Sequence, residues 1–209
     1  MRPRGALRMA AGAGMLVWMA AAGTADLGAT GAAPGADSSA RGAGQAGVGA
    51  GGAGATIAMA STGAAARQVY QRFQSLAGEW KGNSTKGWTD RATFRTIAGG
   101  SVVVESSEFS AHPDETMMTM VHLDGDRLML THYCIAKNQP RLQMTAAQDG
   151  GRKATFNFKD ATNLPSPDKG HMHDAVFEFV DDDHFTSRWS FFKDGREEWM
   201  EEIHFERIR

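Results

Sequence analysis

The sequence has little cysteine and no excess of basic residues, and each shortage excludes a class of protein. Cys134 is the only cysteine among 209 residues, so an intramolecular disulfide framework cannot form. Residues 67–209 carry 18 Lys and Arg against 22 Asp and Glu, which excludes a basic nucleic-acid-binding surface and a polybasic membrane surface. The weakly apolar run 9–22 is shorter than the roughly 20 residues that a membrane helix needs.

Large side chains are almost missing from the first 66 residues. This segment contains 23 alanines and 15 glycines, and it has no Phe, Tyr or His. The rest of the chain holds all 11 Phe and all seven His. We therefore expect one folded domain in the C-terminal part, large enough to fold without disulfides or metals.

The N-terminal residues have the layout of a secretory signal peptide. Three arginines precede the apolar run 9–22, and small residues follow at 20–25. We predict a signal peptide over 1–25, hence a secreted or periplasmic protein with no membrane span after signal cleavage; an uncleaved anchor is the alternative. The Gly- and Ala-rich residues 26–65 are predicted as a disordered linker, and residues 66–209 as the folded domain.

Hydrophobic periodicity in the domain predicts one short helix and then only strands. Val69, Phe73 and Leu76 form an apolar stripe on a helix that begins near Arg67. Alternating runs separated by turn signals then predict ten strands, at 79–85, 90–97, 101–109, 115–123, 127–136, 140–148, 152–159, 171–180, 184–193 and 197–207. Consecutive half-apolar strands favour an all-β, antiparallel up-and-down barrel, because closure removes the exposed edges.

The two ends of this predicted barrel resemble those of lipocalins and related calycin barrels. In those proteins a G-x-W motif follows a short helix, and an arginine of the last strand packs across the tryptophan. Here the motif is Gly78-Glu79-Trp80 and the matching residue is Arg207. The resemblance implies a lipocalin-like barrel over about 66–209, with Arg207 in a structural role. The sequence departs from lipocalins in having no disulfide, and its strand count is nearer to that of fatty-acid-binding proteins and nitrobindins.

Our first hypothesis is an exported barrel that binds a small apolar or amphipathic ligand. Period-two alternation places aromatic and polar side chains inside, and the predicted ligand-binding residues are Trp80, His132, Phe156, His173, Phe177, Trp189 and Glu201. A buried carboxylate such as that of Glu201 serves as an acid or base, or forms an ion pair. No nucleophile elbow, P-loop or H-E-x-x-H motif occurs, so no catalytic residue is predicted and a binding protein is favoured over an enzyme.

Two further hypotheses concern the same barrel. His171-Met172-His173 presents two imidazoles on one strand face, and His132-Tyr133-Cys134 presents an imidazole and a thiol. Those four ligands would suit zinc, and one inward histidine would suit haem, although hydrogen-bonded histidines without a cofactor are favoured over both. The remaining hypothesis is a structural or interaction domain whose barrel is filled by its own side chains.

Overall fold

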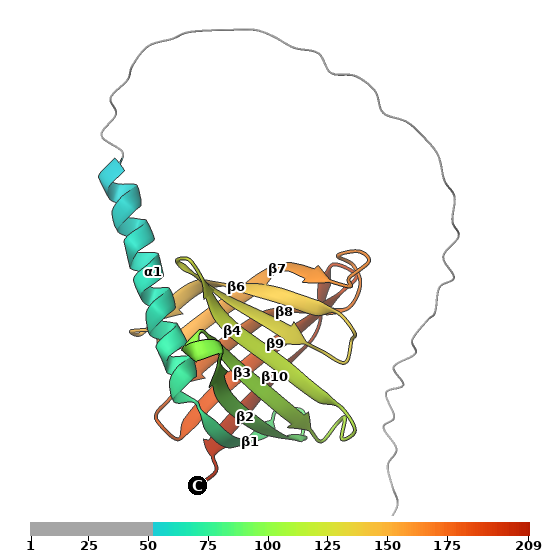
Figure 1. The fold of residues 1–209 in the computed structure, drawn as a ribbon. Helices are drawn as coiled ribbons and strands as arrows, with labels where there is room; N and C mark the ends of the chain where they lie inside the picture. Colours follow the sequence, from blue (N-terminus) through green and yellow to red (C-terminus); the bar gives the residue numbers. More distant parts are fainter. Residues whose placement is uncertain (1–51) are drawn as a thin grey trace, which may run out of the picture. The chain divides into compact units, whose positions relative to one another are not determined.

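The computed structural model describes residues 52–209, which form one helix followed by ten strands (Figure 1). The predicted signal peptide (1–25) and most of the predicted linker (26–65) lie outside the described residues. The first elements are α1 (Gly52–Ser75), β1 (Gly78–Ser84), β2 (Thr89–Ile97), β3 (Val102–Phe109), β4 (Thr116–Asp124) and β5 (Arg127–Tyr133). The others are β6 (Gln139–Gln148), β7 (Lys153–Thr162), β8 (His171–Phe179), β9 (His184–Lys193) and β10 (Arg196–Arg207).

The ten strands form a closed antiparallel barrel. Each strand pairs with its neighbours in sequence, and β1 also pairs with β10, so that no edge strand remains among them. Every predicted strand overlaps an observed one. The predicted all-β, up-and-down barrel is therefore confirmed.

The helix is longer than the apolar stripe predicts. It begins at Gly52 rather than near Arg67, so the described part of the predicted linker includes helical residues. This segment is rich in alanine, which has the highest intrinsic helix propensity. No helix in the described part of the chain is long and apolar enough to cross a membrane.

The C-terminal half of α1 packs against one end of the barrel interior. The Phe73 ring makes edge contacts with Phe177 and Phe179, at centroid distances of 4.9 and 5.2 Å. The hydroxyl group of Tyr70 donates a hydrogen bond of 2.7 Å to the carbonyl oxygen of Gly100, in the connection between β2 and β3. This end of the barrel is thus covered by an apolar helix face.

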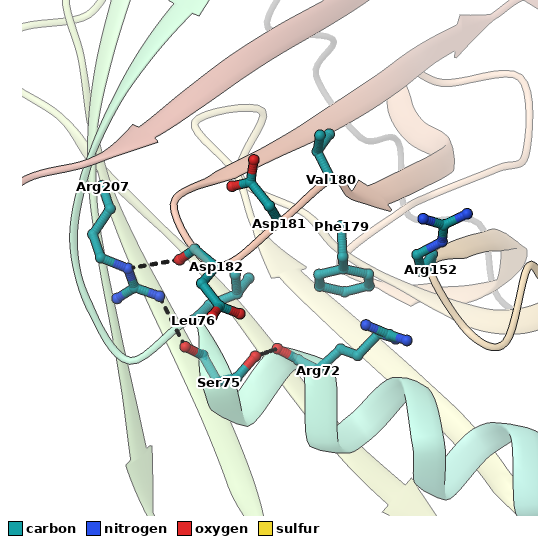
Figure 2. A pocket seen from close by; sticks show the side chains of 9 residues that line it. All are labelled: Arg72, Ser75, Leu76, Arg152, Phe179, Val180, Asp181, Asp182 and Arg207. Atoms are coloured by element: carbon teal, nitrogen blue, oxygen red, sulfur yellow. Dashed lines mark hydrogen bonds between the residues drawn. The ribbon is translucent and has the colours of Figure 1, made fainter.

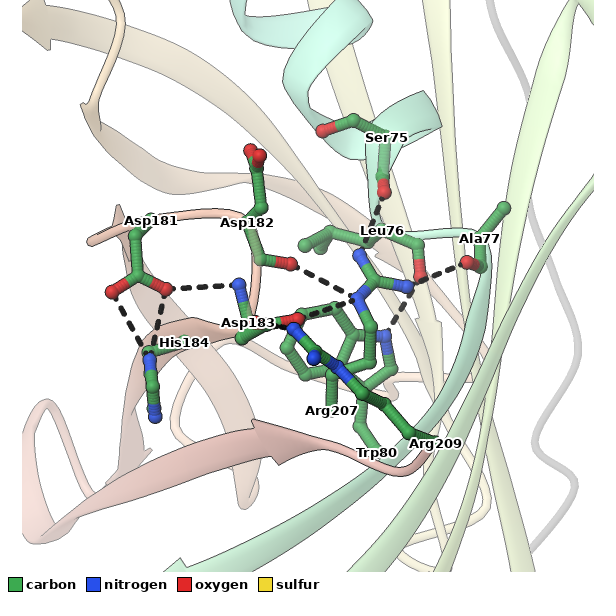
Figure 3. A network of polar contacts seen from close by, with 10 residues as sticks. All are labelled: Ser75, Leu76, Ala77, Trp80, Asp181, Asp182, Asp183, His184, Arg207 and Arg209. Carbon is green, nitrogen blue, oxygen red and sulfur yellow. Dashed lines mark hydrogen bonds and ion pairs between the residues drawn. The ribbon is translucent and has the colours of Figure 1, made fainter.

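Arg207 joins the last strand to the first strand and to the end of α1 (Figure 3). Its guanidinium group lies 4.2 Å from the centre of the Trp80 ring and donates hydrogen bonds to the carbonyl oxygens of Ala77 and Ser75, at 2.8 and 3.0 Å. Trp80 Nε1 donates to the carbonyl oxygen of Leu76 at 2.7 Å. The positive charge of the guanidinium group interacts favourably with the C-terminal end of the helix and with the face of the indole ring.

We expect the substitution Phe73→Ala to lower the free energy of unfolding by about 3–5 kcal/mol, because it removes a buried ring from a packed aromatic cluster. Urea denaturation followed by circular dichroism measures this loss. The matched control is Gln71→Ala, an exposed position of the same helix, where we expect a change within about 0.5 kcal/mol. Equal effects of the two substitutions would show that α1 does not contribute to the core.

Candidate functional site

The inward face of the barrel is aromatic beside α1 and polar farther away. Next to α1, the rings of Trp80 and Phe185 are in edge contact, with their centroids 4.8 Å apart. Asp90 lies at the other end of β2 from the α1-bound turn at Gly100. It belongs to a set of six buried polar residues, which we name the lumenal polar band: Asp90, Glu105, Ser107, Thr119, His132 and Glu201.

Strand register brings the members of this band together. Glu105 on β3 is opposite Thr119 on β4, and Thr119 is opposite His132 on β5. Directly opposed residues share a face of the sheet, so all three point inward. Glu201 on β10 is opposite Trp189 on β9, and the Trp189 ring lies 5.0 Å from the His132 ring. The polar band therefore extends across the interior.

Glu201 connects the band to the β1–β2 connection. Its side chain is only 4% exposed, and Oε1 accepts hydrogen bonds from the Ser84 hydroxyl group and from Trp88 Nε1. The Trp88 ring also packs edge-on against Phe109, with a centroid distance of 5.6 Å. The carboxylate thereby ties the connection between the first two strands to the last strand.

Asp90 is a buried carboxyl group with one hydroxyl partner. Ser107 donates a hydrogen bond of 2.7 Å to Asp90 Oδ1. Burial raises the pKa of Asp90 to about 6, with a further increase from the negative charge of Glu201, while the Ser107 hydrogen bond acts in the opposite direction. Asp90 is therefore ionised mainly above pH 6.

Glu105 is the carboxyl group that is hardest to ionise. The pKa of Glu105 is raised to about 8, mainly by burial and also by the charge of Asp90, while a hydrogen bond with Thr119 acts in the opposite direction. At pH 7 the neutral carboxylic acid is therefore the major form. A positive charge nearby would stabilise the ionised form of Glu105 and lower its pKa.

His132 has a nitrogen atom without a partner. Its Nδ1 lies 3.0 Å from Thr119 Oγ1, whereas Nε2 is buried and has no hydrogen-bond partner. Burial lowers the pKa of His132 to about 4, so the imidazole is neutral at pH 7. A buried polar atom without a partner is unfavourable, and an incoming ligand group would relieve that cost.

The band also lacks positive charge. The described side chains that are buried and polar include three carboxyl groups, at Asp90, Glu105 and Glu201, but no Lys or Arg. Unpaired buried carboxylates are unfavourable. The band is thus rich in hydrogen-bond acceptors and poor in donors.

The residues that the sequence analysis proposed as ligand-binding fall into three places. Three of them lie in the aromatic core beside α1: Trp80, Phe156 and Phe177. Three others meet in or beside the polar band: His132, Trp189 and Glu201. The seventh, His173, lies apart from both groups.

His173 belongs to a small aromatic cluster with His171. The His171 Nε2 and His173 Nδ1 atoms are 3.0 Å apart, and the His173 ring stacks on Phe192 at a centroid distance of 4.0 Å. A β-bulge between Met172 and Asp174 shifts the register of β8, which interrupts the simple alternation used to assign faces. The two imidazoles of the predicted metal set are thus in contact with each other.

The other two members of that set lie on β5 and just beyond it. His132 contacts Thr119 and Trp189, as described above. Cys134 is half-buried, its Sγ accepts a hydrogen bond from the backbone N–H of Ala136, and burial raises the pKa of the thiol. Within residues 52–209 no three His, Cys, Asp or Glu side chains are arranged to hold a metal ion, so the four predicted ligands do not form one site.

A small surface groove of about 80 Å³ lies at the α1 end of the barrel (Figure 2). Three arginines, Arg72, Arg152 and Arg207, line it together with Asp181 and Asp182. Arg207 is already bound to backbone carbonyl groups and to the Trp80 ring, and the two aspartates offset the positive charge. The charged groups that line the groove are therefore already bound or balanced, unlike the carboxyl groups of the lumenal polar band.

The sequence analysis missed Asp90 and Glu105, although a signal for both was present. Asp90 alternates with Ala92 and Phe94 on β2, and Glu105 alternates with Val103 on β3. A charged residue on an otherwise apolar strand face marks a buried carboxyl group. The pairing of Glu105 with Thr119 and His132 required the register of three strands, which the sequence does not specify.

Comparison with known proteins finds similarity in fold rather than in sequence. No family model matches the chain, and no curated protein matches it. The crystal structure of Rv2717c from M. tuberculosis matches with a TM-score of 0.50 and 13% identity, over 68% of this chain and 98% of that chain. A protein of unknown function from the DUF3598 family of Nostoc punctiforme matches with a TM-score of 0.42 and 10% identity, over 65% of this chain and 49% of its own. At such identity the likeness to Rv2717c concerns the barrel fold alone.

Burial of Glu105 makes stability depend on pH. The unfolded glutamate ionises near pH 4.5 and the folded one near pH 8, so between these values the folded protein holds a proton that the unfolded chain has lost. We expect the free energy of unfolding to fall by about 2 kcal/mol from pH 6.5 to 8, a range above the titrations of Asp90 and His132. Urea denaturation at the two pH values measures this decrease.

The variant Glu105→Gln should lose most of that decrease, because the amide does not titrate. The control Glu206→Gln, at an exposed position of β10, should keep it. A wild-type protein equally stable at both pH values would contradict the burial of a neutral Glu105.

Proposed function

We propose that this protein binds a small apolar or amphipathic molecule inside its barrel. The observation that carries the proposal is the unpartnered Nε2 atom of His132, which is buried beside the Trp189 ring. Buried polar atoms in folded proteins generally have a hydrogen-bond partner, and no side chain of the described residues supplies one here. A ligand group that forms a hydrogen bond with this nitrogen would satisfy it.

The chemistry around His132 suits a ligand with two different parts. Small-molecule sites are mostly apolar, with a few polar groups that fix the orientation of the ligand. Trp189 contacts both His132 and Phe177, so it lies between the polar band and the aromatic core. The apolar part of a ligand would lie against these rings, and its polar part would meet the lumenal polar band.

The proposal includes a lipocalin-like type of barrel and export of the protein. The contact of Arg207 with Trp80, directly after a helix, supports the first. The arginines and apolar run within residues 1–25 support the second.

Intact-mass analysis of the chain after expression in an exporting bacterial host tests export. We expect loss of about the first 25 residues, and a full-length chain outside the cytoplasm would contradict cleavage.

We expect n-octanol to raise the midpoint of thermal unfolding in a saturable manner, because a ligand that binds only the folded state stabilises it. The substitution Trp189→Ala should weaken the apparent affinity about tenfold, since it removes a large aromatic surface from the site. Differential scanning fluorimetry over a range of n-octanol concentrations measures both effects.

The matched control is Tyr133→Ala. Tyr133 follows His132 in sequence but is 43% exposed, so its removal should leave the n-octanol effect unchanged. The proposal is wrong if wild-type protein shows no saturable stabilisation, or if the two alanine variants behave alike.

A further inference from the structure

We infer that the ligand of the lumenal polar band carries a cationic head group that donates hydrogen bonds, such as a primary ammonium, on a small apolar body. This inference rests on the proposed function and specifies the class of ligand. It follows from the charges of the band, from its hydrogen-bond inventory and from the aromatic surface beside it.

The charges of the band are all of one sign. Asp90 on β2, Glu105 on β3 and Glu201 on β10 are each at most 9% exposed. The Asp90 carboxyl group is close enough to the other two for their charges to affect each other. Because no buried Lys or Arg lies among the described side chains, the protein itself supplies no neutralising partner. A cationic ligand would supply one.

The hydrogen-bonding groups of the band are likewise mostly acceptors. Asp90 receives one hydrogen bond from Ser107, and Glu201 receives two at a single oxygen atom. An ionised carboxylate has about four acceptor sites, so each of these groups keeps unused acceptor capacity. An ammonium group has three donors and no acceptor, which complements this set.

His132 provides a further indication, which follows from ionisation of Glu105. The Thr119 hydroxyl group lies between Glu105 and His132 and has only one proton to donate. When Glu105 is ionised, Thr119 donates to it and accepts from His132 Nδ1–H. The buried, unpartnered Nε2 atom then carries no proton and can accept a hydrogen bond. The ionised band therefore offers a ligand mainly hydrogen-bond acceptors.

The neighbouring groups favour an organic cation over a metal ion. Within the described residues no three carboxyl, imidazole or thiol groups converge enough to ligate one metal ion. The Trp189 ring lies beside His132, and an indole face attracts a cationic group. An apolar body would lie against the Trp189 and Phe177 rings, whose centroids are 5.8 Å apart.

Proton release should accompany binding of such a ligand. Of the titratable groups in the band, Asp90 from β2 raises the pKa of Glu105 by its charge, and His132 from β5, which shares the Thr119 contact, is neutral at pH 7. A cation nearby would stabilise the ionised form of Glu105, which then loses its proton. A primary ammonium itself stays charged up to about pH 10. Affinity should therefore increase from pH 6 to pH 8.

The experiment is isothermal titration calorimetry of the full chain with three probes of equal length: n-octylammonium, n-octanol and n-octanoate. At pH 8 we expect n-octylammonium to bind at least tenfold more tightly than n-octanol, and n-octanoate to bind most weakly. The preference should shrink at pH 6. Titrations at pH 7 in two buffers of different ionisation enthalpy should show the release of up to about one proton per ammonium bound, as Glu105 ionises.

Two variants identify the group that is responsible. Glu105→Gln keeps the shape of the side chain but replaces one accepting oxygen by an N–H donor and removes the charge, so it should lose both the preference for ammonium and the proton release. Glu206→Gln, on the outer face of β10, should behave like the wild type. If Glu105→Gln does not fold, Asp90→Asn takes its place, and it should lose most of the preference.

The results with the three probes distinguish a failure of this inference from a failure of the proposed function. Binding of n-octanol or n-octanoate as tight as that of n-octylammonium overturns the cationic head group but leaves a lumenal binding site. An unchanged preference in Glu105→Gln also overturns the inference. The absence of binding by all three probes overturns both the inference and the proposed function.

Discussion

The pairing of β1 with β10 is the constraint on which the rest of the structure depends. It closes the sheet and thereby converts one face of ten strands into an interior. Arg207 reinforces this closure, because it joins the last strand to Trp80 on the first strand and to the end of α1. Closure of the sheet holds the polar side chains on the inward face away from water, and at the end far from α1 the side chains of Ser84 and Trp88 cover Glu201.

That separation from water accounts for the chemistry of the lumenal polar band. A carboxyl group on an open sheet would be hydrated and ionised, whereas Asp90 and Glu105 have raised pKa values because they are buried. The same burial keeps His132 neutral and leaves its Nε2 without a partner. Burial of the band is therefore costly, because its carboxyl groups have no buried Lys or Arg partner among the described residues and His132 Nε2 has no hydrogen-bond partner.

The sequence predicts the barrel well because its signals are local. Alternation and Asp-Gly turns locate the strands one by one, and the faces of β10 follow from Trp199 and Glu201 sharing a side. The site is harder to predict because it depends on register between strands. Asp90 was recognisable from its apolar neighbours, but the contact of His132 with Trp189 joins two strands that are distant in sequence. The bulge in β8 likewise has no clear sequence signal, so the surroundings of His173 could not be assigned.

We propose that a ligand is held at the lumenal polar band, and at His132 Nε2 in particular. Nuclear magnetic resonance of protein with ¹⁵N-labelled histidine rings, titrated with n-octanol or n-octylammonium, observes this atom directly. We expect the Nε2 resonance of His132 to shift as the probe forms a hydrogen bond with it, while that of the exposed His204 stays in place. Saturable binding of a probe that leaves the His132 resonances unchanged would contradict it.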